Sequence, residues 1–79
     1  MPIFHLRVIN SDFEARDDLE AVDIRDAMKQ GLRAALQIGS DEICNGKPYF
    51  GGEVCVEHSG GRKERFLVSI GQSPLKKDR

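Results

Sequence analysis

Apolar residues between positions 24 and 36 recur every three or four positions, the spacing that places side chains on one face of an α-helix. The stripe consists of Ile24, Ala27, Met28, Gly31, Leu32, Ala35 and Leu36. Asp23 precedes it and predicts an N-cap, because its carboxylate can accept hydrogen bonds from the free amides of the first turn. We expect a continuous or kinked helix over residues 23–45 that ends before Gly46, with an earlier end at Gly39 as the alternative.

The segment before the helix predicts a hairpin. Residues 3–9 alternate apolar and polar side chains, which is typical of a strand with one buried face. A two-residue turn after this strand would place Val8 opposite Phe13 and so match apolar side chains. The second strand, over about residues 12–16, is short and charged, as expected at the edge of a sheet. Residues 17–22 are predicted to form a loop.

The segment after the helix predicts a second hairpin. Residues 47–52 contain a proline and two glycines and are expected to form a loop. Two alternating segments, residues 53–58 and 64–70, predict the third and fourth strands. A three-residue turn between them sets Val56 opposite Phe66, so that the apolar residues of both strands share one face.

The order strand, strand, helix, strand, strand predicts one α+β domain over residues 1–70, a ββαββ fold with one helix packed on one face of a four-stranded mixed sheet. The first and fourth strands are the most apolar, so we expect them at the centre as parallel neighbours, in the order 2-1-4-3. Residues 71–79 are polar and aperiodic and predict a mobile C-terminal tail.

Composition fits a small folded domain. Of the 79 residues, 39% are hydrophobic and 32% are charged, a balance that argues against a disordered chain. No apolar run approaches the roughly 20 residues that a membrane span needs. The first residues lack the features of a secretory signal, so we expect a cytoplasmic protein without membrane contact. Cys44 and Cys55 are then expected to be reduced thiols.

Spacing offers no catalytic or metal-binding signature. The soft metal ligands are His5, Cys44, Cys55 and His58, and their spacing does not match that of a zinc finger or knuckle. Cys55 and His58 stand three apart on one predicted strand and so point to opposite faces, which argues against a nucleophile and base pair. We therefore nominate no catalytic residue, no metal and no cofactor, and expect a protein that is not an enzyme.

The sheet face opposite the helix is the predicted binding surface. Apolar side chains there are interleaved with polar ones, and a small domain gains stability by burying such a surface against another protein. Tyr49 and Phe50, in the predicted 47–52 loop, can supply aromatic anchors. The residues expected to contact a partner are Ile3, His5, Ile9, Tyr49, Phe50, Cys55 and Leu67. We expect a non-enzymatic binding or assembly module that forms a homodimer or binds another protein.

The alternative function is a small nucleic-acid-associated or antitoxin-like regulator. Arg62, Lys63 and Arg65 lie in the second predicted hairpin, where they can contact a phosphate backbone and displace counterions. The net charge of −1 argues against this function, because domains that bind nucleic-acid grooves are usually strongly basic.

Several short motifs resemble a known family. They are the opening Met-Pro-Ile-Phe-His-Leu-Arg-Val, the pair Asp17-Asp18, the helix start Asp23-Ile24-Arg25-Asp26-Ala27, and the segment from Gly46-Lys47-Pro48 to Val54-Cys55-Val56. Together they resemble a family of small uncharacterised domains found mainly in alphaproteobacteria, over most of residues 2–70. Members commonly carry a glycine in the acidic loop, where this chain has Asp18 or Leu19. The resemblance implies no activity, ligand or site residue.

Overall fold

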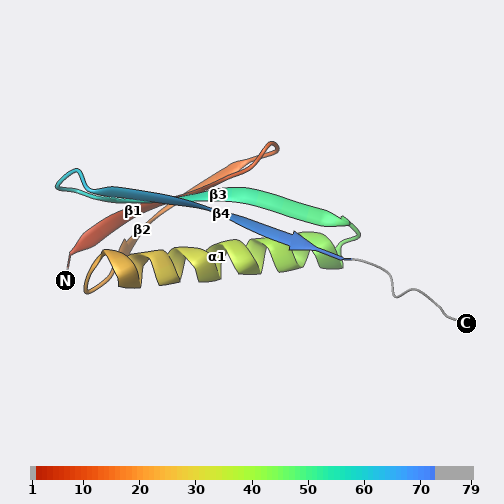
Figure 1. Ribbon diagram of the computed structural model, residues 1–79, viewed down its shortest axis with the longest axis horizontal. Coiled ribbons are helices and arrows are strands. Elements are labelled where there is room, and N and C mark those ends of the chain that lie inside the picture. Colours follow the sequence, from red (N-terminus) through yellow and green to blue (C-terminus); the bar gives the residue numbers. More distant parts are fainter. Residues whose placement is uncertain (1, 73–79) are drawn as a thin grey trace, which may run out of the picture.

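Two hairpins and one helix form the structure, a computed structural model that describes residues 2–72 (Figure 1). The elements are β1 (Ile3–Ile9), β2 (Glu14–Glu20), α1 (Ile24–Cys44), β3 (Tyr49–His58) and β4 (Lys63–Gly71). The strands form one sheet and α1 runs along one face of it, which confirms the α+β class and the ββαββ order. Of the predicted tail, Gly71 ends β4, and residues 73–79 lie outside the described residues.

Helix α1 begins and ends close to the predicted positions. Asp23 is the N-cap, and its Oδ1 accepts a hydrogen bond from the Asp26 backbone N–H at 2.9 Å. The Asp26 carboxylate in turn accepts from the Val22 backbone N–H at 3.1 Å. The helix passes through Gly39 without interruption, and Gly46 follows its end with a φ of 107°. The single continuous helix is therefore confirmed.

Small residues hold α1 close to the sheet. Ala27, Gly31, Ala35 and Gly39, spaced four apart, are the buried residues of the helix. A Cβ atom on Gly39 would lie 2.5 Å from Cδ1 of Ile70 and 2.8 Å from the ring of Phe50. Leu32 and Leu36 were expected in the buried stripe, but the close approach leaves them at its margin, 38% and 41% exposed.

The core lies between α1 and the sheet, and it includes Phe50. The side chain of Phe50 is 2% exposed, because β3 begins at Tyr49 and directs every second side chain toward the helix. The prediction of a loop over residues 47–52 was therefore wrong for positions 49–52. The other buried core residues are Phe4, Leu6, Val8, Ala21, Ala27, Ala35, Val54, Val56 and Val68.

The predicted strand order was wrong. The sheet has the order β2-β1-β3-β4, all neighbours are antiparallel, and the expected mixed sheet with adjacent first and fourth strands does not form. Strand β3 is central, paired with β1 on one side and β4 on the other, and its Val54, Cys55 and Val56 are buried in succession. The run Phe66-Leu67-Val68 in β4 is equally apolar, but β4 pairs only with β3 and its Leu67 is exposed.

The first hairpin has a longer turn than predicted. The Asn10 side-chain Oδ1 accepts from the backbone N–H groups of Asp12 at 2.8 Å and Phe13 at 3.0 Å, which stabilises a wider turn. Val8 therefore lies opposite Ala15 rather than Phe13. Strand β2 consequently continues through positions 17–20, which were predicted to be loop.

The second hairpin turns one position earlier than predicted. The His58 backbone N–H donates to the Arg62 carbonyl at 2.7 Å, which closes a three-residue loop in which Gly61 adopts a φ of 105°. Val56 lies opposite Glu64, and Phe66 lies opposite Val54. A shift of two positions keeps each side chain on its predicted face, which is why the interpretation of the faces was right although the register was wrong.

Candidate binding face

The face of the sheet away from α1, here called the open face, presents rows of side chains that cross all four strands. Residues opposite each other in neighbouring antiparallel strands share a face, so each row takes one residue from each strand. The basic row is Arg16, Arg7, Cys55 and Arg65. The rows on either side of it are Glu14, Ile9, Glu53 and Leu67, and Asp18, His5, Glu57 and Lys63. Three arginines therefore lie between rows that contain carboxylates.

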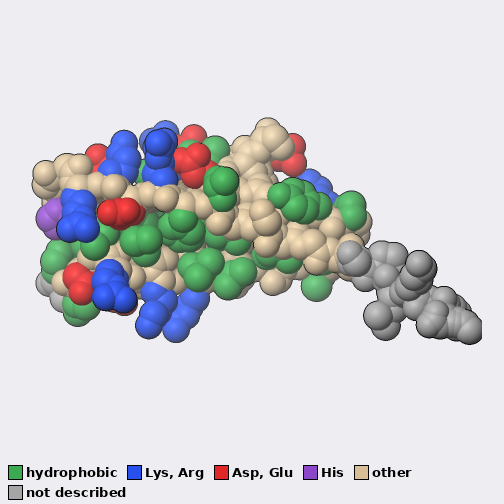
Figure 2. Space-filling model, viewed as in Figure 1, with side chains coloured by type: hydrophobic (Ala, Val, Ile, Leu, Met, Phe, Trp, Pro, Cys, Tyr) green, Lys and Arg blue, Asp and Glu red, His purple; other side chains and the backbone are tan. Residues whose placement is uncertain are grey.

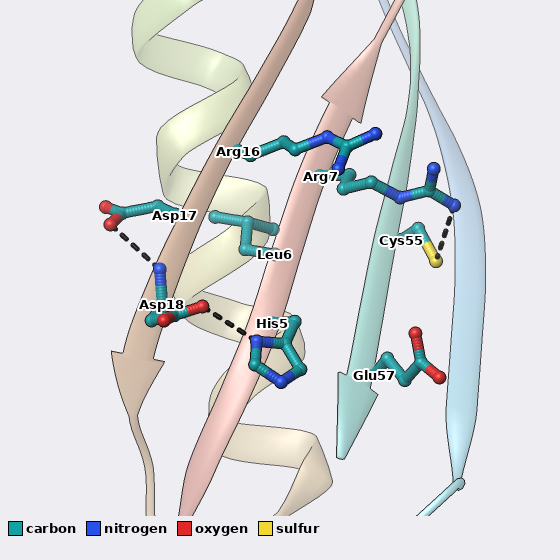
Figure 3. A pocket seen from close by; sticks show the side chains of 8 residues that line it. All are labelled: His5, Leu6, Arg7, Arg16, Asp17, Asp18, Cys55 and Glu57. Carbon is teal, nitrogen blue, oxygen red and sulfur yellow. Dashed lines mark hydrogen bonds and ion pairs between the residues drawn. The ribbon is translucent and has the colours of Figure 1, made fainter. Parts of the chain in front are cut away.

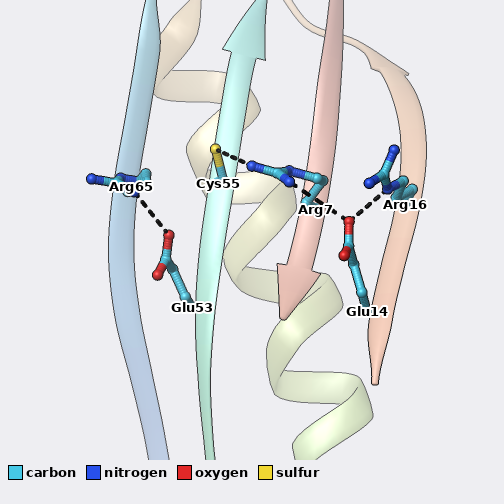
Figure 4. Close-up of polar contacts among 6 residues, drawn as sticks. All are labelled: Arg7, Glu14, Arg16, Glu53, Cys55 and Arg65. Carbon is cyan, nitrogen blue, oxygen red and sulfur yellow. Dashed lines mark hydrogen bonds and ion pairs between the residues drawn. The ribbon is translucent and has the colours of Figure 1, made fainter. Parts of the chain in front are cut away.

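Ion pairs join the basic row to one of its neighbours (Figure 4). A carboxylate oxygen of Glu14 accepts from Arg16 Nε at 2.6 Å and lies 3.7 Å from Arg7 Nη1. Glu53 lies 3.6 Å from Arg65 Nη1. These side chains are partly exposed, so each pair contributes at most about 1 kcal/mol. Their consequence is that the charges of the open face are largely neutralised within it.

Cys55 lies at the centre of this face but is covered. Its exposed fraction is 1%, and Arg7 Nη2 lies 4.0 Å from its sulfur. This contact is the main cause that raises the pKa of Arg7 above its ordinary value. Loss of hydration lowers the pKa of Arg7 and so opposes the shift. Electrostatic attraction to Cys55 and to the carboxylates of Glu14 and Glu57 raises it further. The Arg7 guanidinium group lies beside the Cys55 thiol. Cys55 was predicted to contact a partner, but its burial keeps it from doing so.

A hollow of about 450 Å³ opens beside Cys55 (Figure 3). His5 lies on its wall, and His5 Nδ1 is 2.7 Å from Asp18 Oδ1. Arg7, Arg16, Asp17 and Glu57 also line the hollow, so its walls carry both signs of charge and select neither anions nor cations. Within residues 2–72, no group of three or more His, Cys, Asp or Glu side chains is arranged to hold a metal ion.

A second hollow, here called the glycine-floored depression, lies toward the Tyr49 end of β3 on the open face. It has a volume of about 390 Å³, and its apolar walls include Ile9, Tyr49 and Leu67. Gly51 lies under Tyr49, because a Cβ atom on Gly51 would come within 2.8 Å of the Tyr49 Oη. That hydroxyl also lies 3.2 Å from Ser69 Oγ. The Tyr49 ring therefore lies back across the strand instead of extending into solvent.

The structure brings three of the seven predicted contact residues together. Leu67 is 80% exposed, Tyr49 is 59% exposed, and Ile9 is half-buried beside them. Ile3 lies at the opposite end of β1, and Phe50 faces the core, so the prediction that Phe50 is an exposed anchor was wrong.

The residues that the sequence analysis missed are Gly51 and Gly52, which line the depression. Their signal was present as a glycine doublet after an aromatic pair, but it was interpreted as a loop. In a strand, Gly51 removes a side chain from the open face and so leaves a hollow that neighbouring side chains border, whereas a side chain at Gly52 would point toward Phe50 on the helix side.

The basic hairpin residues are partly neutralised. Arg62 lies 3.7 Å from Glu64, and Arg65 lies 3.6 Å from Glu53. Lys63 stands opposite Glu57 in the sheet register. The three cations predicted to contact nucleic acid thus each have a carboxylate nearby, which weakens the positive potential of this hairpin.

Comparison of the chain with protein-family models, with curated proteins and with solved structures found no match. The resemblance to the alphaproteobacterial domain family therefore stays a prediction. Among residues 2–72, no helix combines the length and the apolar character that crossing a membrane requires.

Proposed function

We propose that this protein is a small, non-enzymatic interaction module that binds another protein through the open face of its sheet. The contact centre is the glycine-floored depression, where Ile9, Tyr49 and Leu67 come together from three strands. This convergence is the observation that carries the proposal, because exposed apolar side chains grouped around a hollow are typical of binding sites, whereas scattered ones are ordinary.

The depression fits an aliphatic or aromatic side chain presented by a partner protein. Leu67 and Tyr49 supply apolar walls, and the hydroxyls of Tyr49 and Ser69 supply polar groups at the rim. An anchor residue that enters a pocket with a polar rim is the usual centre of a protein interface. The ion pair of Glu53 and Arg65 lies beside the depression and offers either sign of charge to the rest of the partner.

Titration with side-chain analogues tests this function. The full chain, labelled with ¹⁵N, is titrated with N-acetyl-leucinamide and N-acetyl-phenylalaninamide while its amide chemical shifts are followed. We expect saturable shifts centred on Gly51, Gly52 and Leu67, with N-acetyl-glycinamide as the analogue that lacks an apolar side chain. Leu67→Ser should weaken these shifts, whereas Gln37→Ser, on the far flank of α1, should leave them unchanged.

The outcome that contradicts the proposal is an absence of saturation, or shifts that spread evenly over the surface. Titration of the same sample with duplex DNA and with duplex RNA at two salt concentrations tests the alternative. Salt-sensitive shifts at Arg62, Lys63 and Arg65 would favour the nucleic-acid function. We expect no such shifts, because Arg62 and Arg65 are paired with Glu64 and Glu53.

A further inference from the structure

The two edges of the sheet differ in how well they are protected against pairing. Edge strand β2 has five charged residues among seven, and its Asp18 backbone N–H is already bonded to the Asp17 side chain at 2.8 Å. Edge strand β4 has charges only at positions 63–65, and residues 66–71 carry none. Charged side chains are a common means of keeping an edge strand unpaired. By this criterion β2 is protected and the second half of β4 is not.

The hydrogen bonds of the second hairpin show which backbone groups of β4 point away from β3. The His58 N–H donates to the Arg62 carbonyl, and the Gln72 N–H donates to the Pro48 carbonyl at 3.1 Å. Bonded and non-bonded pairs alternate along an antiparallel ladder, so the even-numbered residues of β4 bond to β3. The odd-numbered residues direct their N–H and C=O groups away from the sheet; they are Lys63, Arg65, Leu67, Ser69 and Gly71.

An exposed apolar flank of α1 runs beside this same edge. Gly39 packs against Ile70 of β4, and Leu32 and Leu36 precede it by seven and three residues, which places both on the flank of α1 nearest β4. The opposite flank faces β2, because the Gln30 side chain donates to the Glu20 carbonyl at 2.9 Å. Figure 2 shows hydrophobic side chains gathered in a band between the sheet and the helix.

We propose that β4 pairs antiparallel with β4 of a second copy of this chain, which extends the sheet to eight strands about a two-fold axis and brings the exposed flanks of the two helices together. The pairing uses the outward backbone groups of Leu67 and Ser69 together with the helix flank, whereas the glycine-floored depression uses the side chains of Ile9, Tyr49 and Leu67 on the open face. Solution mass measures the pairing and titration with apolar analogues measures the depression, so a failure of one proposal is distinguishable from a failure of the other.

A register centred on Val68 brings compatible side chains together on both faces of the joined sheet. On the helix side it places Phe66 beside the partner's Ile70, and Val68 beside the partner's Val68. On the open face, Leu67 lies opposite the partner's Ser69. The free backbone groups of residues 65–71 then exchange about eight hydrogen bonds across the axis. A symmetric dimer of this kind is the commonest oligomer of soluble proteins.

Charge complementarity favours the antiparallel arrangement. The charged residues of β4, at positions 63–65, come to lie opposite its uncharged end, so no like charges meet. Gly39 is level with Ile70, and the rise per residue of helix and strand puts Val68 level with about position 35 of α1. Each helix then presents Arg25 and Lys29, which share the flank of Leu32 and Leu36, toward the C-terminal end of the other helix, where the macrodipole is negative.

Sedimentation and hydrogen exchange test the pairing on the full chain. We expect a mass of twice 8.8 kDa at high protein concentration. In the same sample the amides of Leu67 and Ser69 should exchange at least about tenfold more slowly than that of Arg16, which points outward from the unpaired β2 edge. Equal exchange at the two edges, or a monomer at millimolar concentration, would overturn the inference.

Proline variants show whether the β4 edge carries the dimer. The Ser69 N–H points away from the sheet, so Ser69→Pro removes no internal backbone bond but blocks pairing. Arg16→Pro makes the same change on the β2 edge, and Ser69→Ala removes only the hydroxyl. We expect Ser69→Pro to be a monomer and both controls to be dimers. A dimer that survives Ser69→Pro would overturn the inference.

A helix variant decides the matter if Ser69→Pro fails to fold by circular dichroism. Leu36 is 41% exposed in one chain, so Leu36→Lys leaves the core intact but puts a charge at the proposed helix contact. Gln37→Lys adds the same charge on the other flank. Dissociation by Leu36→Lys alone supports the pairing, and a dimer retained in both variants contradicts it. Dissociation by Tyr49→Ala, with Leu36→Lys still a dimer, would assign self-association to the open face instead.

Discussion

At the scale of single residues, the close approach of α1 to the sheet depends on its glycines. Gly39→Ala should destabilise the protein by about 1–2 kcal/mol, because overpacking a filled core costs more than the alanine gains in helix propensity. The new methyl group would lie 2.8 Å from the ring of Phe50, which is itself buried and cannot move aside freely. Urea unfolding followed by circular dichroism gives the free energy.

The control for this prediction is Ser40→Ala in the next position of the helix. Ser40 is exposed, so the substitution tests helix propensity without packing and should be neutral or slightly stabilising. If Gly39→Ala is as stable as Ser40→Ala, the helix lies farther from the sheet than the contacts of Gly39 indicate.

At the scale of elements, the two adjacent aromatic residues of β3 have opposite roles. Phe50 is 2% exposed and Tyr49 is 59% exposed. Phe50→Ala should cost about 3–5 kcal/mol, the usual loss for a buried phenylalanine, and this approaches the whole stability of a small domain. Tyr49→Ala should cost less than about 1 kcal/mol, because an exposed ring loses little burial.

Thermal unfolding of the Phe50→Ala and Tyr49→Ala variants distinguishes these roles. A folded Phe50→Ala variant with a melting temperature near that of the natural chain would show that Phe50 is not a core residue. The sequence-based prediction of Phe50 as a partner-binding anchor would then be supported.

The pattern of side chains predicted elements better than it predicted their arrangement. Alternation and the Asp23 cap located four strands and one helix, because these signals are local in the sequence. The register of each hairpin depended on the length of its turn, and in the first hairpin the Asn10 side chain stabilises a longer turn. Matching apolar residues alone favoured Val8 opposite Phe13, whereas the structure pairs Val8 with Ala15. The strand order depended on pairing between segments distant in the sequence, and apolar content could not decide it, because Val54-Cys55-Val56 in a central strand is no more apolar than Phe66-Leu67-Val68 at an edge.

The candidate site was predictable to a similar extent. The shared face of Ile9 and Leu67 followed from alternation in their predicted strands, whereas Tyr49 was expected in a loop, and only the start of β3 at Tyr49 brings it to the same depression. The covering of Cys55 by Arg7 was not predictable, because it depends on cross-strand register between distant segments. The exposed flank of α1 was missed for a related reason: the small residues that set the distance between helix and sheet shift the buried stripe away from Leu32 and Leu36.

At the scale of the whole molecule, a domain of 79 residues buries a modest core, and joining two copies would enlarge it. If folding and β4 pairing are coupled, the melting temperature must rise with protein concentration, because association stabilises the folded chain by mass action. A tenfold increase in concentration favours a dimer by about 1.4 kcal/mol. For two chains of this size that corresponds to a rise of roughly 3–6 °C.

Differential scanning calorimetry over a hundredfold range of concentration measures this dependence. The natural chain and Arg16→Pro should both show the rise, whereas Ser69→Pro should melt at one temperature throughout, because its β4 edge cannot pair. A constant melting temperature for the natural chain would mean that each copy folds without help from the other. The small core between α1 and one face of the sheet would then be sufficient by itself, and the unprotected β4 edge would have to be explained by a different partner strand.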